Sequence, residues 1–307
     1  MADLRSRLAS PVLFPACLGA LGSGIALEHA VSLGVPQTLA TAWQVIAAGL
    51  YLACLAAYAA RVVRQPELVM QDIRPPPMRG TLSAGAMGLM LLAALLLQIS
   101  QDLARAVWLL GIALHLASMI AVTVTMFATR GQGFAASPVL YLPFVGLVVA
   151  PIAGLPLGET PFSALVLYAA LPSAAMVALA VLVTLFLGPV PPAQRAAQAI
   201  HLAPVSLIGT GASGLGNPAL FLAAFAVASL VATLLVLRLR WITAGGWHPG
   251  WSAFTFPSAA FAVLCMTFEG WLPGHGVVWF AWPALVTACA VTLWTLARLL
   301  LPPSTRG

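Results

Sequence analysis

The sequence contains no lysine and has few charged residues of any kind. Only 7% of its 307 residues are charged, whereas 62% are hydrophobic and the mean hydropathy is +1.03. A soluble domain carries roughly a quarter of its residues as charges, so the composition excludes a protein whose whole surface faces water. It indicates an integral membrane protein, which we expect to form a single transmembrane domain over residues 1–307.

Cysteine is also scarce, and motifs typical of enzymes are missing. The four cysteines, Cys17, Cys54, Cys265 and Cys289, lie in apolar runs without C-x-x-C spacing, so we expect neither a disulfide framework nor a zinc site. The five histidines fall in different segments, and no H-E-x-x-H or G-x-S-x-G motif is present. Because an active site needs such groups gathered together, the sequence predicts no catalytic residue, no metal and no cofactor.

Apolar runs with few charges recur along the whole chain. Each is close to the roughly 20 residues that cross the hydrocarbon core as a helix. Their number predicts an all-α fold of ten transmembrane helices. The predicted spans are residues 11–28, 41–63, 82–101, 105–128, 138–157, 162–187, 198–214, 217–238, 250–269 and 276–300.

The positions of the arginines support this count, because cytoplasmic loops carry an excess of basic residues. With the N-terminus inside, ten crossings leave only Arg105 outside. A missed helix would reverse every later loop. The arginines are spread over short loops and form no patch for nucleic acid, so we expect a multi-pass protein of the bacterial inner membrane with both termini in the cytoplasm. The arginines predicted to be inside are Arg5, Arg7, Arg61, Arg64, Arg74, Arg79, Arg130, Arg195, Arg238, Arg240, Arg298 and Arg306.

Glycine and proline distinguish odd-numbered from even-numbered spans. The odd spans hold 19 of these residues and the even spans hold 6. Proline kinks a helix, and the freed carbonyl is tolerated at membrane depth only where protein or water satisfies it. We therefore predict five helical hairpins, with an inner ring of odd helices around a central pore, kinked at Pro15, Pro143, Pro204 and Pro257. Close helix packing is the alternative explanation for the small residues.

Polar groups inside the spans are few and weak. All seven acidic residues lie at helix ends or in loops, whereas ion-coupled carriers usually bury a carboxylate at mid-membrane. Hydroxyls on the odd spans could solvate an anion, although such groups usually bond to their own helix. They are Ser23, Ser83, Ser206, Thr210, Ser213, Ser252, Thr255 and Ser258.

The most distinctive local motif is WSAFTFP, residues 251–257, at the start of the ninth span. An aromatic ring beside a proline bend can close a narrow pore by steric block and dewetting. A packed or lipid-facing phenylalanine is the alternative interpretation.

Four segments carry a family resemblance: WSAFTFP in the ninth span, FPACLGALGSGIAL in the first, SPVLYLPFVGLVVA in the fifth and HLAPVSL in the seventh. The chain resembles the tellurite-resistance/dicarboxylate transporter family, which includes bacterial tellurite-resistance channel homologues, fungal malic acid transporters and the slow anion channels of plant guard cells. The resemblance implies a homotrimer in which each protomer has its own pore, closed by a phenylalanine on the ninth helix. That residue corresponds to Phe256, with Phe254 as the alternative.

The leading hypothesis is therefore a gated channel for small anions, with Phe256 as the gate. The second hypothesis is a secondary transporter of C4-dicarboxylates such as malate, or of related oxyanions such as tellurite. The third is a membrane scaffold or sensor with a vestigial pore, which predicts neither flux nor ligand binding. The absence of any sizeable segment outside the membrane argues against the scaffold.

Overall fold

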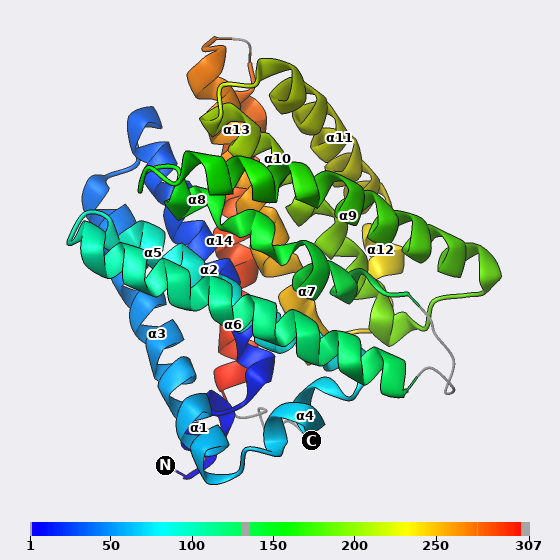
Figure 1. The fold of residues 1–307 in the computed structure, drawn as a ribbon. Helices are drawn as coiled ribbons and strands as arrows, with labels where there is room; N and C mark the ends of the chain where they lie inside the picture. Colours follow the sequence, from blue (N-terminus) through cyan, green and yellow to red (C-terminus); the bar gives the residue numbers. More distant parts are fainter. Residues whose placement is uncertain (1, 130–135, 275, 302–307) are drawn as a thin grey trace.

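The structure is a computed structural model that describes residues 2–129, 136–274 and 276–301, and helices dominate these parts of the chain (Figure 1). The predicted all-α membrane fold is confirmed. Eight of the described helices are long and apolar enough to cross a membrane, some of them extended by a 3-10 turn. They are α2 (Phe14–His29), α3 (Gln37–Arg64), α5 (Thr81–Leu96), α6 (Gln101–Ala128), α9 (Thr160–Leu187), α11 (Pro218–Leu237), α13 (Thr255–Trp271) and α14 (Val278–Leu300).

The fifth and seventh predicted spans are not continuous α-helices. The chain between Pro138 and Gly154 is divided into η5 (Pro138–Leu140), α7 (Tyr141–Val145), η6 (Gly146–Val149) and α8 (Pro151–Gly154). The seventh segment consists of the 3-10 helix η7 (Pro192–His201) followed by α10 (Leu202–Gly214). With these two broken segments the structure accommodates ten crossings, and the count of ten stays a prediction.

Each of the five odd segments begins in the same way, with a 3-10 turn whose first residue is proline. Four of these turns are short: η1 (Pro11–Leu13), η3 (Pro76–Met78), η5 and η8 (Pro249–Phe254); η7 is the longer fifth. Proline suits a first helical position, because its missing N–H would have no intrahelical partner there and its φ angle is already helical. The repeat indicates five equivalent hairpins that all start in one way.

The odd segments form a closed ring. Contacts run from α2 to α5, from α5 to η6, from η6 to α10, from α10 to α13 and from α13 back to α2. Each even helix packs against the segment that precedes it: α3 on α2, α6 on α5, α9 on α7 and α8, α11 on α10, and α14 on α13. The predicted arrangement of five hairpins around an inner ring is therefore present.

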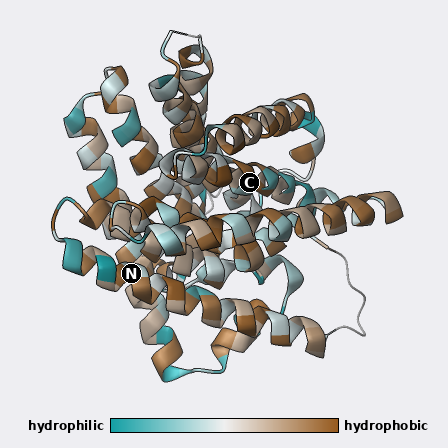
Figure 2. Cartoon of the chain, turned by 45° about the horizontal axis from the view of Figure 1, so that its top comes forward, coloured by the Kyte–Doolittle hydropathy of each residue, from teal (hydrophilic) through white to brown (hydrophobic). Residues whose placement is uncertain are grey.

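Burial separates the two sets of helices. In an 18-residue stretch of each span that contains α2, α5 or α13, 83%, 78% and 61% of residues are buried, whereas the figures for the outer helices lie between 17% and 33%. Outer helices expose large apolar side chains, such as Ile46, Phe186 and Val236. Figure 2 shows hydrophobic residues along the lengths of these helices and hydrophilic ones mainly near their ends. Such apolar surfaces suit lipid, and the protein is a multi-pass membrane protein.

Outer helices also hold the inner ring in place through hydrogen bonds. The Tyr51 hydroxyl of α3 donates to the Gly85 carbonyl at 2.6 Å, and the Trp108 ring nitrogen of α6 donates to the Ala150 carbonyl at 2.9 Å. Buried backbone groups away from water need such partners, so these bonds fix the depth of α5 and of the broken fifth segment.

Three short helices lie at the same end of the molecule as the N-terminus. They are α1 (Ala2–Leu8), α4 (Leu68–Ile73) and α12 (Leu239–Ile242), while η2 (Ala30–Leu33) extends α2 at its other end. Arg7 donates to the carbonyl of Leu301 at 2.7 Å. The first and last described helices therefore meet at one end, as an even number of crossings requires. Arg130 and Arg306, both predicted to be cytoplasmic, lie outside the described residues.

Candidate functional site

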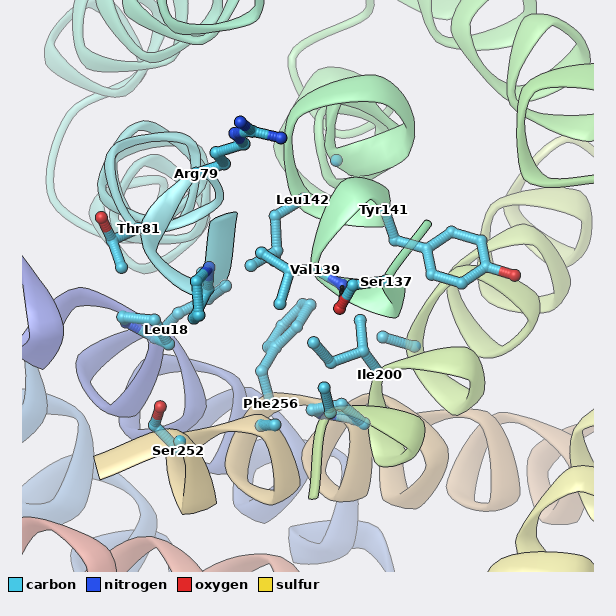
Figure 3. Close-up of a pocket in the computed structure, with 18 of the residues that line it drawn as sticks. Leu18, Arg79, Thr81, Ser137, Val139, Tyr141, Leu142, Ile200, Ser252 and Phe256 are labelled. Atoms are coloured by element: carbon cyan, nitrogen blue, oxygen red, sulfur yellow. Dashed lines mark hydrogen bonds between the residues drawn. The ribbon is translucent and has the colours of Figure 1, made fainter. Parts of the chain in front are cut away.

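A cavity of about 550 Å³ lies inside the ring, at the N-terminal ends of its five segments. Every odd segment contributes to its wall (Figure 3). Representative lining residues are Pro15 and Leu18 from α2, Met87 from α5, Val145 and Gly146 from the broken segment, Pro204 and Leu207 from α10, and Phe256 and Pro257 from α13. The starting turns η3, η5, η7 and η8 surround the mouth of this larger cavity.

A second cavity, of about 10 Å³, lies further along the same five segments. This smaller cavity has room for about one water molecule. Its wall contains Gly22, Ile25, Leu91, Ile152, Leu207, Thr210, Phe256, Ala260 and Val263. Phe256 and Leu207 line both cavities, so these two side chains stand between them.

Neighbouring residues fix the position of the Phe256 ring, which is 4% exposed. Thr255 precedes it, and the Thr255 hydroxyl lies 2.8 Å from the Ser252 carbonyl oxygen and 3.1 Å from that of Pro15 on α2. On the other side the ring packs on Gly22, where an added Cβ would lie 3.1 Å from Cδ2 and 3.3 Å from Cε2 of Phe256. Figure 3 shows the ring projecting from α13 toward the middle of the lining residues.

Phe254 is placed differently. It is half-buried, lines neither cavity and packs edge-on against Trp251, with 5.4 Å between ring centroids. Trp251 belongs to an aromatic cluster with Trp247 and Trp294, and the Arg298 guanidinium lies over the rings of Trp247 and Trp294. Of the two phenylalanines in the motif, Phe256 is therefore the one on the cavity axis.

The four prolines predicted to kink the odd helices divide into two groups. Pro15, Pro204 and Pro257 line the larger cavity and lie in the first turn of α2, α10 and α13. In a first turn, proline costs no intrahelical hydrogen bond, and the change from 3-10 to α-helix occurs beside it. Pro143 is buried in the broken fifth segment and lines neither cavity.

Few of the predicted hydroxyls reach the cavities. Thr210 lines the smaller cavity and Ser252 lines the larger; the other six line neither. Ser206, Thr210 and Ser258 donate to carbonyls four residues earlier in the chain, at 2.7 to 3.1 Å. The Thr255 hydroxyl donates to the Ser252 carbonyl, and the Ser83 hydroxyl forms a hydrogen bond with that of Ser118 at 2.8 Å. Ser213 is half-buried. Ser23 is buried and has no hydrogen-bond partner among the described residues.

Sequence reasoning missed polar residues at the mouth of the larger cavity: Thr81, Ser137, Gln194 and His248. A signal was available for Ser137, because a serine directly before a proline is typical of the start of a helix. In the structure its hydroxyl accepts from the Val139 N–H at 3.4 Å. His248 accepts from the Gly250 N–H at 3.1 Å through Nδ1, and partial burial lowers its pKa. Both the accepted hydrogen bond and the lowered pKa favour the uncharged form of the His248 ring.

Arg79 is the one charged residue among the described residues of the wall. It is 9% exposed, and its Nη2 donates to the Thr129 hydroxyl at 3.0 Å. Ion pairs of the described residues lie elsewhere, such as Arg61 with Asp72, 3.3 Å apart, and Arg105 with Glu159. Apart from its mouth, the larger cavity is therefore mainly apolar.

A ring of buried, broken helices around a cavity, inside a shell of lipid-facing helices, is the architecture of a membrane channel or transporter. The chain belongs to the voltage-dependent anion channel family, whose model matches residues 9–300. Members of this family are anion channels or transporters rather than enzymes, so this protein is an anion channel or transporter. The resemblance found in the sequence is confirmed. No curated protein matches the chain.

Proposed function

We propose that the protein is a gated channel for small anions, with a pore that follows the axis of the inner ring and is closed by Phe256. The observation that carries this proposal is the position of Phe256 in the wall of both cavities. A bulky apolar side chain at a constriction excludes water as well as ions. Removing that side chain would join the two cavities into one continuous path.

The mouth of the larger cavity favours anions without holding them tightly. Five helical segments start there, and the N-terminal end of a helix carries a partial positive charge. Arg79 adds one full positive charge, and no described acidic residue lines either cavity. Beyond Phe256 the wall is apolar apart from Thr210. Weak binding permits fast exit, which suits conduction better than tightly coupled transport.

Orientation and assembly form part of the proposal. The arginine distribution supports a cytoplasmic position for both termini and for the larger cavity, in a bacterial inner membrane. The bond between Arg7 and the Leu301 carbonyl supports a shared side for the two ends. The sequence resemblance suggests a homotrimer, and the exposed apolar faces of the outer helices provide surface for both lipid and neighbouring protomers.

The test is the current through planar bilayers that contain purified wild type, Phe256→Ala or Phe254→Ala, with chloride, nitrate and malate in turn. Phe256→Ala is expected to raise anion-selective current by at least about tenfold, the effect of removing roughly 1.4 kcal/mol from the closed state. Phe254→Ala is the matched control and is expected to resemble wild type, because Phe254 lines neither cavity. An unchanged current in correctly folded Phe256→Ala would remove the gate from the proposal. Saturable malate uptake into liposomes without current would indicate the dicarboxylate transporter.

A further inference from the structure

The guanidinium of Arg79 has no acidic partner among the described residues. Among the described residues its one hydrogen bond is from Nη2 to Thr129, Nε is buried without a partner, and no acidic side chain forms an ion pair with it. A buried charge is costly unless it is paired. Because Arg79 lines the larger cavity, an anion bound in that cavity can supply the missing charge.

A helix N-terminus follows Arg79 in the chain. The 16-residue helix α5 starts at Thr81, two residues after Arg79, and no side chain caps it at Gly80. The first N–H groups of such a helix have no intrahelical partner, and together with the helix dipole they form a site for negatively charged oxygen atoms. Thr81 lines the same cavity. Arg79 and the first turn of α5 therefore form one anion-binding corner.

The remainder of the wall has a different character. Leu18, Met87, Val139, Leu142 and Phe256 line it, and among the described residues no second charged side chain does. In Figure 3, Arg79 and Phe256 lie on opposite sides of the labelled lining residues. A volume of about 550 Å³ is within the range of roughly 300–1,000 Å³ that is typical of sites for small organic ligands.

From this arrangement we propose that the larger cavity binds organic monocarboxylates with an apolar body. The carboxylate lies against Arg79 and the first turn of α5, and the body lies against the apolar wall that ends at Phe256. The inference deepens the proposed anion pathway and rests on it, since it names the substrate class that occupies the path before the gate.

The same geometry disfavours dicarboxylates. One carboxylate group would use Arg79, while the second would face the apolar wall or uncharged side chains at the mouth, such as Ser137 and Gln194. A second charge left without a partner in an apolar site weakens binding. We therefore expect a monocarboxylate such as benzoate to bind more tightly than succinate, although succinate carries more charge.

Calorimetric titration of the purified full-length protein in lipid nanodiscs tests this, with benzoate, benzamide, acetate and succinate as probes. Benzoate is expected to bind at least about tenfold more tightly than succinate and than its neutral isostere benzamide. It is also expected to bind roughly tenfold or more tightly than acetate, because its ring buries more apolar surface. Benzamide or succinate binding as well as benzoate would overturn the proposal.

Variants locate the site. Arg79→Gln is expected to weaken benzoate binding at least about tenfold. Arg79→Lys is expected to weaken it less, because lysine keeps the positive charge but cannot bind a carboxylate in a bidentate way. Arg74→Gln is the matched control, since Arg74 is exposed and lies on the same connection between α3 and α5. Equal losses in Arg79→Gln and Arg74→Gln would overturn the assignment. If Arg79→Gln fails to fold, the probe series on wild type still decides the question.

Failure of this inference is distinguishable from failure of the channel. Benzoate binding requires no conduction. Large currents in Phe256→Ala without benzoate binding to wild type would reject the carboxylate site and leave the channel intact. Benzoate binding without current in any variant would reject the channel and leave the site.

Discussion

Gly22 gives the Phe256 ring the space in which it separates the two cavities. A methyl group at this position would lie 3.1 Å from Cδ2 of the ring and 3.1 Å from the Ala259 Cβ, which is closer than ordinary contact. Phe256 and Ala259 belong to the same helix, α13. The Phe256 ring can rotate about its side-chain bonds, whereas the Ala259 Cβ moves only with the backbone, so the ring is easier to displace. At the scale of single residues, a glycine on α2 therefore determines where the ring lies.

Gly22→Ala is expected to raise anion current, because the added methyl group crowds the Phe256 ring in its present position. Overpacking costs about 1–3 kcal/mol, and where this cost falls on the closed state the current should rise roughly 5- to 150-fold in bilayer recordings. Gly49→Ala is the control, since an added Cβ at Gly49 meets nothing within 4 Å. In the double variant, Gly22→Ala should change the anion current of Phe256→Ala little. A further large increase in current would show that the methyl group acts on something other than the ring.

At the scale of elements, Thr255 joins the start of α13 to α2. Its hydroxyl contacts the carbonyls of both Ser252 and Pro15, and the approach is so close that a Cβ on Gly19 would lie 2.3 Å from Thr255. Thr255→Val keeps the shape and removes these bonds. The expected loss is about 1 kcal/mol, or roughly 2–4 °C in Tm. Ser258→Ala removes only a bond to the Phe254 carbonyl, one turn earlier in the same segment, and should leave Tm nearly unchanged in thermal unfolding in detergent. Equal shifts would contradict the special role of Thr255.

How far the sequence predicts these elements depends on the kind of signal. Hydropathy and the arginine positions predicted most spans, and the glycine and proline counts predicted which helices lie inside, because small residues permit the close packing that a five-membered ring requires. The same prolines did not reveal that the fifth segment breaks at Val145, nor that η7 continues for ten residues as a 3-10 helix. Helix and 3-10 helix differ by small changes in backbone angle, which composition does not encode.

The candidate site, too, could be predicted from the sequence only in part. The motif around Phe256 was visible in the sequence because a proline and two rings stand together. The participation of Arg79 in the cavity wall was not visible, since its position follows from the packing of α5 against the broken fifth segment. The eight predicted hydroxyls were selected by span and not by face, and six of them line neither cavity.

At the scale of the whole molecule, two cavities separated by Phe256 and Leu207 predict access from opposite sides of the membrane. The test uses single cysteines in a background without Cys17, Cys54, Cys265 and Cys289. Ala197 lines the larger cavity and Thr210 lines the smaller, and both are partly exposed. A charged thiol reagent that cannot cross the membrane reports the side from which each position is reached.

With Phe256 in place, Ala197→Cys is expected to react only from the cytoplasmic side and Thr210→Cys only from the other side, because the ring and Leu207 separate the two walls. In a Phe256→Ala background, Thr210→Cys should also react from the cytoplasm, since the barrier is then missing. Sealed vesicles of known orientation make the comparison direct. Cytoplasmic modification of Thr210→Cys while Phe256 is intact would mean that the barrier lies elsewhere, and modification of Ala197→Cys from outside alone would reverse the proposed orientation.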